Sequence, residues 1–162
     1  MEPKKAKVIK ASLELQQRVG SGPLDEKKVA ECERIIQENN IDFGPMAAEF
    51  LGKLQQAIQY AKSPGADLVQ AKQKMTQPVM ELKANAAIFK YDLIGTLANV
   101  MLSFLEAVKS IDRTVVDIVE AHHKTLTIIV MKKMSGDGGP HGKLFEQELK
   151  DACKRYFVKK AS

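Results

Sequence analysis

The stretch LIGTLANVMLSFL, residues 93–105, is the longest run of the chain without a charged residue. Its 13 residues are too few for a membrane-spanning helix, which needs about 20. Its apolar residues lie nearly all round a helix, so contacts on several sides are expected. Two arrangements satisfy this requirement: the central helix of a monomeric bundle, or a helix with one face covered by a second copy of the chain.

The apolar rhythm of this stretch extends in both directions, from Ala66 to about Lys109. Pro78 is the strongest helix breaker there, and the apolar residues recur every three or four positions, at Met75, Val79, Leu82, Ala86, Phe89, Leu93, Leu97, Val100, Phe104 and Val108. The spacing predicts one long central helix, kinked near Pro78 because proline lacks an N–H and crowds the preceding turn. Such a helix would measure about 66 Å at 1.5 Å per residue, roughly twice the span of a small domain.

A projecting helix of that length would expose a large apolar surface, so we expect a second copy of the chain to cover it. The candidate interface residues are Phe89, Leu93, Leu97, Val100 and Phe104. Asn85 and Asn99 lie on the same helix, where they either fix register and oligomeric state through polar partners or are ordinary exposed side chains.

A shorter amphipathic helix is predicted over residues 24–39. Pro23 suits the first turn of a helix, and the acids Asp25 and Glu26 suit its positive end. Its apolar stripe comprises Val29, Cys32, Ile35 and Ile36. The turn 42–45 then leads into another amphipathic helix that ends before Ser63, and a connection this short predicts an antiparallel hairpin of the two.

Two further helices are expected, over residues 112–134 and about 143–160, and no segment has the pattern of a strand. The fold class is therefore all-α, an up-and-down bundle of about five helices in residues 23–162. Residues 1–22 are expected to form a basic N-terminal segment that is either partly helical or disordered. Val8, Ala11, Leu15 and Val19 have helical spacing there.

Composition bounds the class of protein. The 162 residues are 44% hydrophobic and 28% charged, an ordinary globular balance. The formal charge of +5 is concentrated at the two ends, +3 in residues 1–22 and +3 in 141–162. Weak binding of nucleic acid or an anionic membrane through these basic ends is one alternative function, although the basic clusters lack interleaved aromatics and nucleic acid is therefore disfavoured. The absence of a signal-peptide pattern and of paired cysteines favours a cytoplasmic location.

His122 and His123 are the side chains most suggestive of chemistry. On a helical wheel each lies about 50° from the centre of the apolar face, so we expect two boundary residues. A histidine phosphotransfer protein using His122 or His123, with Lys124 as an electrostatic helper, is the alternative function. The spacing to a following lysine and glycine does not match such domains. A metal site with His141 is disfavoured because adjacent helical residues diverge.

The glycine-rich segment 135–142 separates the last two helices. A phosphate-binding loop requires G-x-x-x-x-G-K-[S/T], but Asp137 and Leu144 occupy two of the fixed positions. We expect a flexible linker, with a mobile partner-binding loop as the alternative.

No constellation of residues points to catalysis or to a cofactor. The sequence therefore predicts a helical-bundle protein-interaction or signalling module without catalytic activity. We expect it to form a homodimer and to bind another protein through a helical face.

Overall fold

The computed structural model describes residues 25–38 and 42–161, and every regular element within these ranges is a helix. The chain divides into two compact units, residues 1–38 and 39–162, which are described separately. The all-α fold class is confirmed. The domain boundary expected after residue 22 and the helical spacing over 8–19 lie outside the described residues.

Unit 1 contributes the helix α2 (Glu26–Gln37), which confirms the helix expected over 24–39. The Asp25 carboxylate caps it, accepting hydrogen bonds from the backbone N–H groups of Lys27 and Lys28 at 3.1 and 3.3 Å. The cap satisfies donors that have no partner within a helix. The expected hairpin with the following helix stays a prediction.

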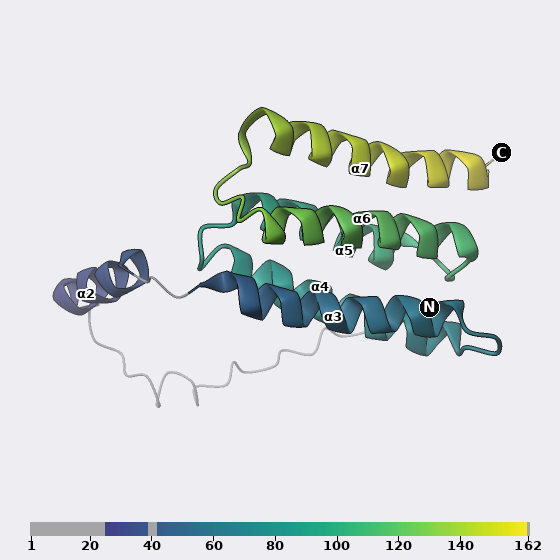
Figure 1. Cartoon of the computed structure of the whole chain (residues 1–162), viewed down its shortest axis with the longest axis horizontal. Helices are drawn as coiled ribbons and strands as arrows, with labels where there is room; N and C mark the ends of the chain where they lie inside the picture. The colour runs from purple at the N-terminus through teal and green to yellow at the C-terminus, as the bar shows by residue number, and fades with distance from the viewer. Residues whose placement is uncertain (1–24, 39–41, 162) are drawn as a thin grey trace, which may run out of the picture. The chain divides into compact units, whose positions relative to one another are not determined.

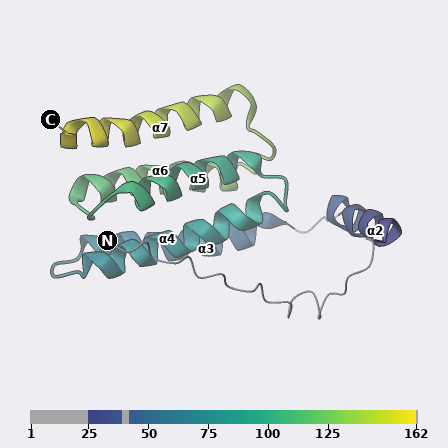
Figure 2. The ribbon, with the colours of Figure 1, turned by 180° about the vertical axis from the view of Figure 1, so that it is seen from behind.

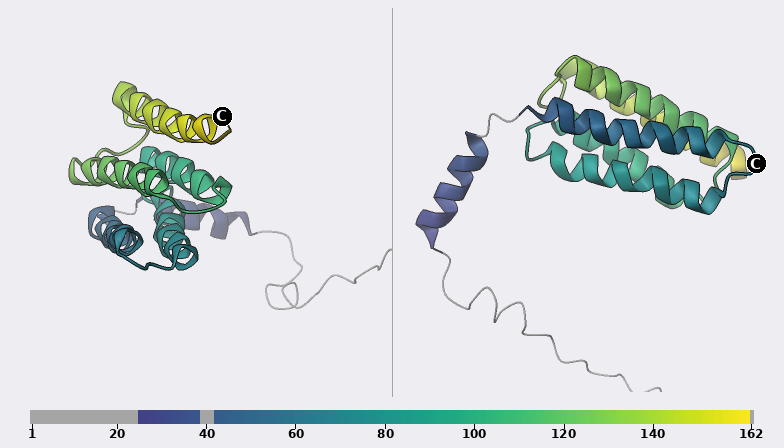
Figure 3. Two further views of the ribbon diagram at one scale, coloured as in Figure 1. Left: turned by 90° about the vertical axis from the view of Figure 1, so that its right-hand side faces the viewer. Right: turned by 60° about the horizontal axis from the view of Figure 1, so that its bottom comes forward.

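Unit 2 consists of five helices stacked in three layers (Figure 1). The first layer pairs α3 (Phe43–Lys62) with α4 (Leu68–Ala86), and the second pairs α5 (Asp92–Ala107) with α6 (Arg113–Met131). The helix α7 (Gly139–Ala161) lies over α5 and α6 as the third layer. Figure 2 shows the same order from behind, and the end-on view in Figure 3 separates the layers clearly. No helix in the described ranges is long and apolar enough to cross a membrane.

Aspartate side chains cap the N-termini of three of these five helices. Asp42, Asp67 and Asp112 each accept hydrogen bonds from backbone N–H groups of the first turn of α3, α4 and α6, respectively. Short polar side chains at this position stabilise a helix start by about 1 kcal/mol. The helix starts are therefore encoded locally, before any tertiary packing is considered.

The core of unit 2 is aliphatic and centres on α5. This helix contacts α4, α6 and α7, and half of its residues are buried: Leu93, Ile94, Leu97, Ala98, Met101, Leu102, Phe104 and Leu105. Contacts on three sides explain why its apolar residues are not confined to one stripe. Of the two arrangements that the sequence left open, α5 adopts that of a central helix covered by its own chain.

The single long helix expected over 66–109 is wrong, because α4 ends at Ala86 and α5 begins at Asp92. Lys90 has a φ of 60°, and the Tyr91 N–H donates to the Ala86 carbonyl at 2.9 Å. This is the Schellman motif, in which one residue in the left-handed region ends an α-helix. Phe89 stacks on Phe43 of α3 at 5.0 Å between ring centroids. The turn thus keeps the apolar rhythm while it reverses the chain, whereas α4 continues through Pro78.

The glycine-rich segment 135–142 runs into α7, which begins at Gly139, and its first part is hydrogen-bonded to the turn between α4 and α5. The expected flexibility of this segment stays a prediction. The Gly136 N–H donates to the Lys90 carbonyl at 2.7 Å, and the Leu93 N–H donates to the Gly136 carbonyl at 2.8 Å. At Gly142 an added Cβ would lie 2.0 Å from the Asp137 carbonyl oxygen. Glycine is required here because the backbone approaches itself too closely for a side chain.

Candidate functional site

His122 lies inside the bundle. Its side chain is 0% exposed, so the expectation of a boundary residue is wrong. Nδ1 lies 3.0 Å from the Ile118 carbonyl oxygen one turn earlier, whereas Nε2 is buried without a hydrogen-bond partner among the described residues. Burial lowers the pKa of His122, and the bond to Ile118 only partly opposes this. The imidazole is therefore neutral near pH 7, with the proton on Nδ1.

His123 joins α6 to α3. Its partly buried ring places Nε2 3.1 Å from the Leu51 carbonyl oxygen of α3, and its Nδ1 is buried without a partner among the described residues. Burial lowers the pKa of His123, while the Leu51 carbonyl and Glu120 oppose the shift. Lys124 is exposed and approaches Glu120 at 3.7 Å. Each histidine thus has one ring nitrogen buried and the other at hydrogen-bond distance from a backbone carbonyl oxygen.

The residues expected at a dimer interface belong to the chain's own core. Leu93, Leu97 and Phe104 are 3%, 0% and 3% exposed, and Phe89 and Val100 are partly buried against the same core. The expected role of α5 as an interface loses its physical basis, because α4, α6 and α7 already cover this helix.

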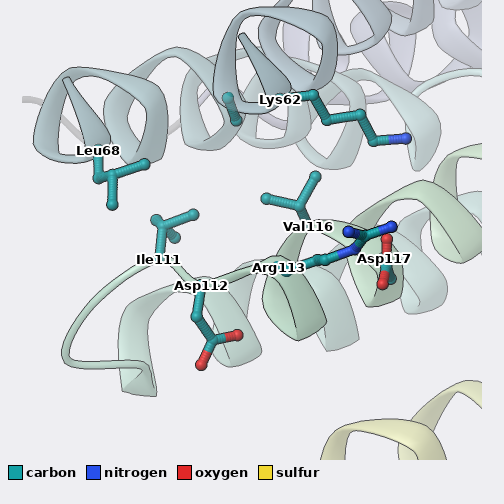
Figure 4. A pocket seen from close by; sticks show the side chains of 8 residues that line it. Lys62, Leu68, Ile111, Asp112, Arg113, Val116 and Asp117 are labelled. Atoms are coloured by element: carbon teal, nitrogen blue, oxygen red, sulfur yellow. The ribbon is translucent and has the colours of Figure 1, made fainter. Parts of the chain in front are cut away.

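A cleft of about 440 Å³ opens at one end of the bundle. Lys62 reaches it from α3, Leu68 from the start of α4, and Arg113 and Asp117 from the first turns of α6 (Figure 4). Ala61, Ile111, Asp112 and Val116 complete the lining. The wall is therefore apolar, with charges of both signs at its rim.

The charges around this cleft largely compensate one another. Lys62 pairs with Glu120 at 2.9 Å, and this ion pair lowers the pKa of Glu120. Asp112 caps α6 through the Val115 N–H and also accepts from Tyr156 at 3.1 Å and pairs with Lys160 at 3.0 Å. Such paired groups hold helix ends together, and they present neither an activated nucleophile nor a general base.

Cysteine and metal chemistry receive no support within the described ranges. Burial raises the pKa of the Cys153 thiol to about 11, so this cysteine is unreactive at neutral pH. Cys32 is exposed on α2. The described part of the chain holds no group of three or more histidine, cysteine or acidic side chains arranged to bind a metal ion.

An exposed apolar stripe lies on α2. Val29, Ile35 and Ile36 are 40%, 57% and 52% exposed, and Cys32 lies among them. On the opposite face Arg34 pairs with both Glu31 and Glu38 at 2.6 Å. The sequence showed the stripe, but its periodicity gave no indication of how exposed these side chains are.

Comparisons with known protein families, with curated proteins and with solved structures find no match for this chain. We therefore infer the function from the chemistry of the described residues.

Proposed function

We propose that this chain is a non-catalytic protein-interaction module whose binding element is the apolar stripe of α2. The observation that carries the proposal is the exposure of Val29, Ile35 and Ile36 on a helix whose other face is organised by ion pairs. Val29, Cys32 and Ile36 stand at positions i, i+3 and i+7. Residues at this spacing are those by which an amphipathic helix docks into a groove or against another helix.

The length of α2 supports this assignment. A helix of 12 residues is marginal in water on its own, because nucleation costs more than so few hydrogen bonds return. Its internal ion pairs are exposed and each contributes only a few tenths of a kcal/mol. Burial of the stripe against a partner supplies the missing stabilisation, at about 25 cal/mol per Å² of apolar surface.

Unit 2 then serves as a scaffold. We infer that its five helices follow an up-and-down order, since successive helices are joined by short connections. Its core is closed and its end cleft is compensated in charge, so neither feature competes with α2 as a binding element. The proposal includes homodimer formation, binding to another protein through a helical face, and a cytoplasmic location.

Histidine phosphotransfer is a weaker proposal, because each imidazole has one nitrogen buried and the other engaged by a backbone carbonyl. Binding through the basic ends is weaker too. In α7, Lys160 pairs with Asp112 and Lys154 pairs with Asp151, while the N-terminal lysines lie outside the described residues.

Thiol labelling tests whether the stripe is open. At low micromolar protein, Cys32 should react with 5,5′-dithiobis(2-nitrobenzoic acid) at the rate of a free thiol, while Cys153 reacts only after denaturation. The buried cysteine provides an internal control in the same molecule. Protection of Cys32 by tenfold or more would show that the stripe is covered within the chain, and the proposal would fail.

Affinity capture from cells of the source organism supplies the second part of the test. The wild type and an Ala30→Glu variant should retain the same partner, and Val29→Glu should lose it. Ala30 and Val29 are adjacent on α2 and both are exposed. The two variants therefore place the same new charge beside the stripe and within it.

A further inference from the structure

The stripe of α2 has the spacing of a coiled-coil seam. Val29, Cys32 and Ile36 follow one another at intervals of three and four residues. In a heptad labelled a to g, this spacing places Val29 and Ile36 at a positions and Cys32 at the intervening d position. β-branched residues at a favour a parallel pair of helices over larger assemblies.

The charges beside the seam select an orientation. Lys28 occupies the g position and Glu33 the following e position, one on each flank of the stripe. In residues 25–38 and 42–161 neither side chain takes part in an ion pair, whereas the outer-face charges of Arg34, Glu31 and Glu38 pair with one another. Lys28 and Glu33, which border the apolar stripe, are thus among the charges of α2 that form no ion pair with another described residue.

A parallel pair brings these opposite charges together. A g residue of one helix then faces the e residue of the next heptad on the other helix, so Lys28 meets Glu33 of the second copy twice by symmetry. In an antiparallel pair g residues face g residues and e residues face e residues. The g residues of α2 are Lys28 and Ile35 and its e residues are Glu26 and Glu33, so Lys28 meets no acid and Glu33 meets another acid. Like charges at these positions disfavour that orientation.

We propose that α2 binds α2 of a second copy as a parallel two-stranded coiled coil, with Val29 and Ile36 in the seam. The inference rests on the proposed function and names the partner. Because α2 spans only about 18 Å at 1.5 Å per residue, the seam is short and pairing requires high protein concentration. The two Cys32 thiols face each other across the symmetry axis.

Disulfide trapping of the full chain tests the pairing. In a Cys153→Ala background at high micromolar protein, oxidised glutathione should link Cys32 of two copies, with one molecule reduced to two glutathione thiols per disulfide formed. Val29→Glu should reduce the yield of covalent dimer at least tenfold, and Ala30→Glu should leave it unchanged. Far-UV circular dichroism and the unfolding midpoint of unit 2 should be equal in all variants.

Charge reversal tests the flanking pair. Lys28→Glu should lower the yield several-fold, and Lys28→Glu combined with Glu33→Lys should restore it. These positions lie five residues apart on one helix and do not face each other there, so restoration reports a contact between copies.

A moved cysteine tests the direction of the second helix. With Cys32 and Cys153 both replaced by alanine, Val29→Cys should also cross-link, because the same position meets itself in a parallel pair. In an antiparallel pair centred on residue 32 the two copies of residue 29 lie about 9 Å apart along the axis, beyond disulfide reach.

The outcomes separate this inference from the proposed function. Rapid labelling of Cys32 in dilute protein, together with monomeric light scattering and no cross-link at high concentration, overturns the pairing and leaves the open stripe in place. Cross-linking through Cys32 but not through Val29→Cys overturns the parallel orientation. Protection of Cys32 in dilute protein shows packing within one chain, and both proposals then fail.

Discussion

Because of His122, the free energy of unfolding of the bundle should decrease on mild acidification. The substitution His122→Leu should remove the part of this decrease that His122 causes. The folded state holds the pKa of His122 below its ordinary value of 6.5, because the ring is buried. As the pH falls below 6.5, the unfolded chain takes up a proton that the folded chain does not. The free energy of unfolding therefore decreases with falling pH until the folded-state pKa is reached.

The slope of that decrease has a physical limit. One proton bound only by the unfolded chain changes the free energy of unfolding by about 1.4 kcal/mol per pH unit. His123 acts in the same direction because its pKa is also lowered by burial. The slope of the wild type should therefore not exceed about 2.7 kcal/mol per pH unit, and the slope of His122→Leu should be smaller, at most about 1.4 kcal/mol per pH unit.

At neutral pH the same substitution should be neutral or stabilising. The buried Nε2 of His122 has no partner among the described residues, and an unsatisfied buried polar atom costs about 1–3 kcal/mol. Leucine removes this atom and suits the aliphatic core. It also loses the bond from Nδ1 to the Ile118 carbonyl, worth about 1 kcal/mol.

Urea unfolding followed by far-UV circular dichroism at several values between about pH 5 and 7.5 measures the slope. The lowered pKa values of Asp42, Glu120 and Asp151 affect stability mainly below about pH 4.5, outside this window. His141→Gln is the matched control, because His141 is exposed. A His122→Leu variant with the wild-type slope would refute the reasoning.

Five further substitutions, two of them matched controls, test the packing of unit 2 by urea unfolding. Met101→Ala should lower the free energy of unfolding by about 2–5 kcal/mol, because this side chain is 0% exposed. Its control, Val69→Ala, lies at an 81% exposed position and should change the free energy of unfolding by less than about 0.5 kcal/mol. Equal losses would contradict the assigned core. Gly142→Ala should lower the unfolding midpoint, because its Cβ would lie 2.0 Å from a carbonyl oxygen. Its control, Gly52→Ala, has no atom within 4 Å of the added Cβ and should stabilise α3 by up to about 1 kcal/mol. Asp112→Ala should cost about 1–2 kcal/mol through loss of the α6 cap, and a neutral result would show that the cap is dispensable.

The sequence by itself determined the helical class and most helix positions. Apolar residues at intervals of three and four indicated the helices, Pro23 and Asp25 indicated the start of α2, and the break after Lys62 agreed with Ser63 and its neighbours. These signals are local, since a cap or a breaker acts within one or two turns of the backbone. They could therefore be interpreted without knowledge of the fold.

The tertiary structure decided what covers each apolar face. Periodicity places Leu97 and Val29 on apolar faces alike, yet Leu97 is buried beneath neighbouring helices and Val29 is exposed on α2. The periodicity of the sequence also gave no sign of the chain reversal at Lys90. Phe89 and Tyr91 keep the apolar rhythm there, and in the structure both rings pack on Phe43. Burial depends on which elements meet, and that is set by contacts between residues far apart in the chain.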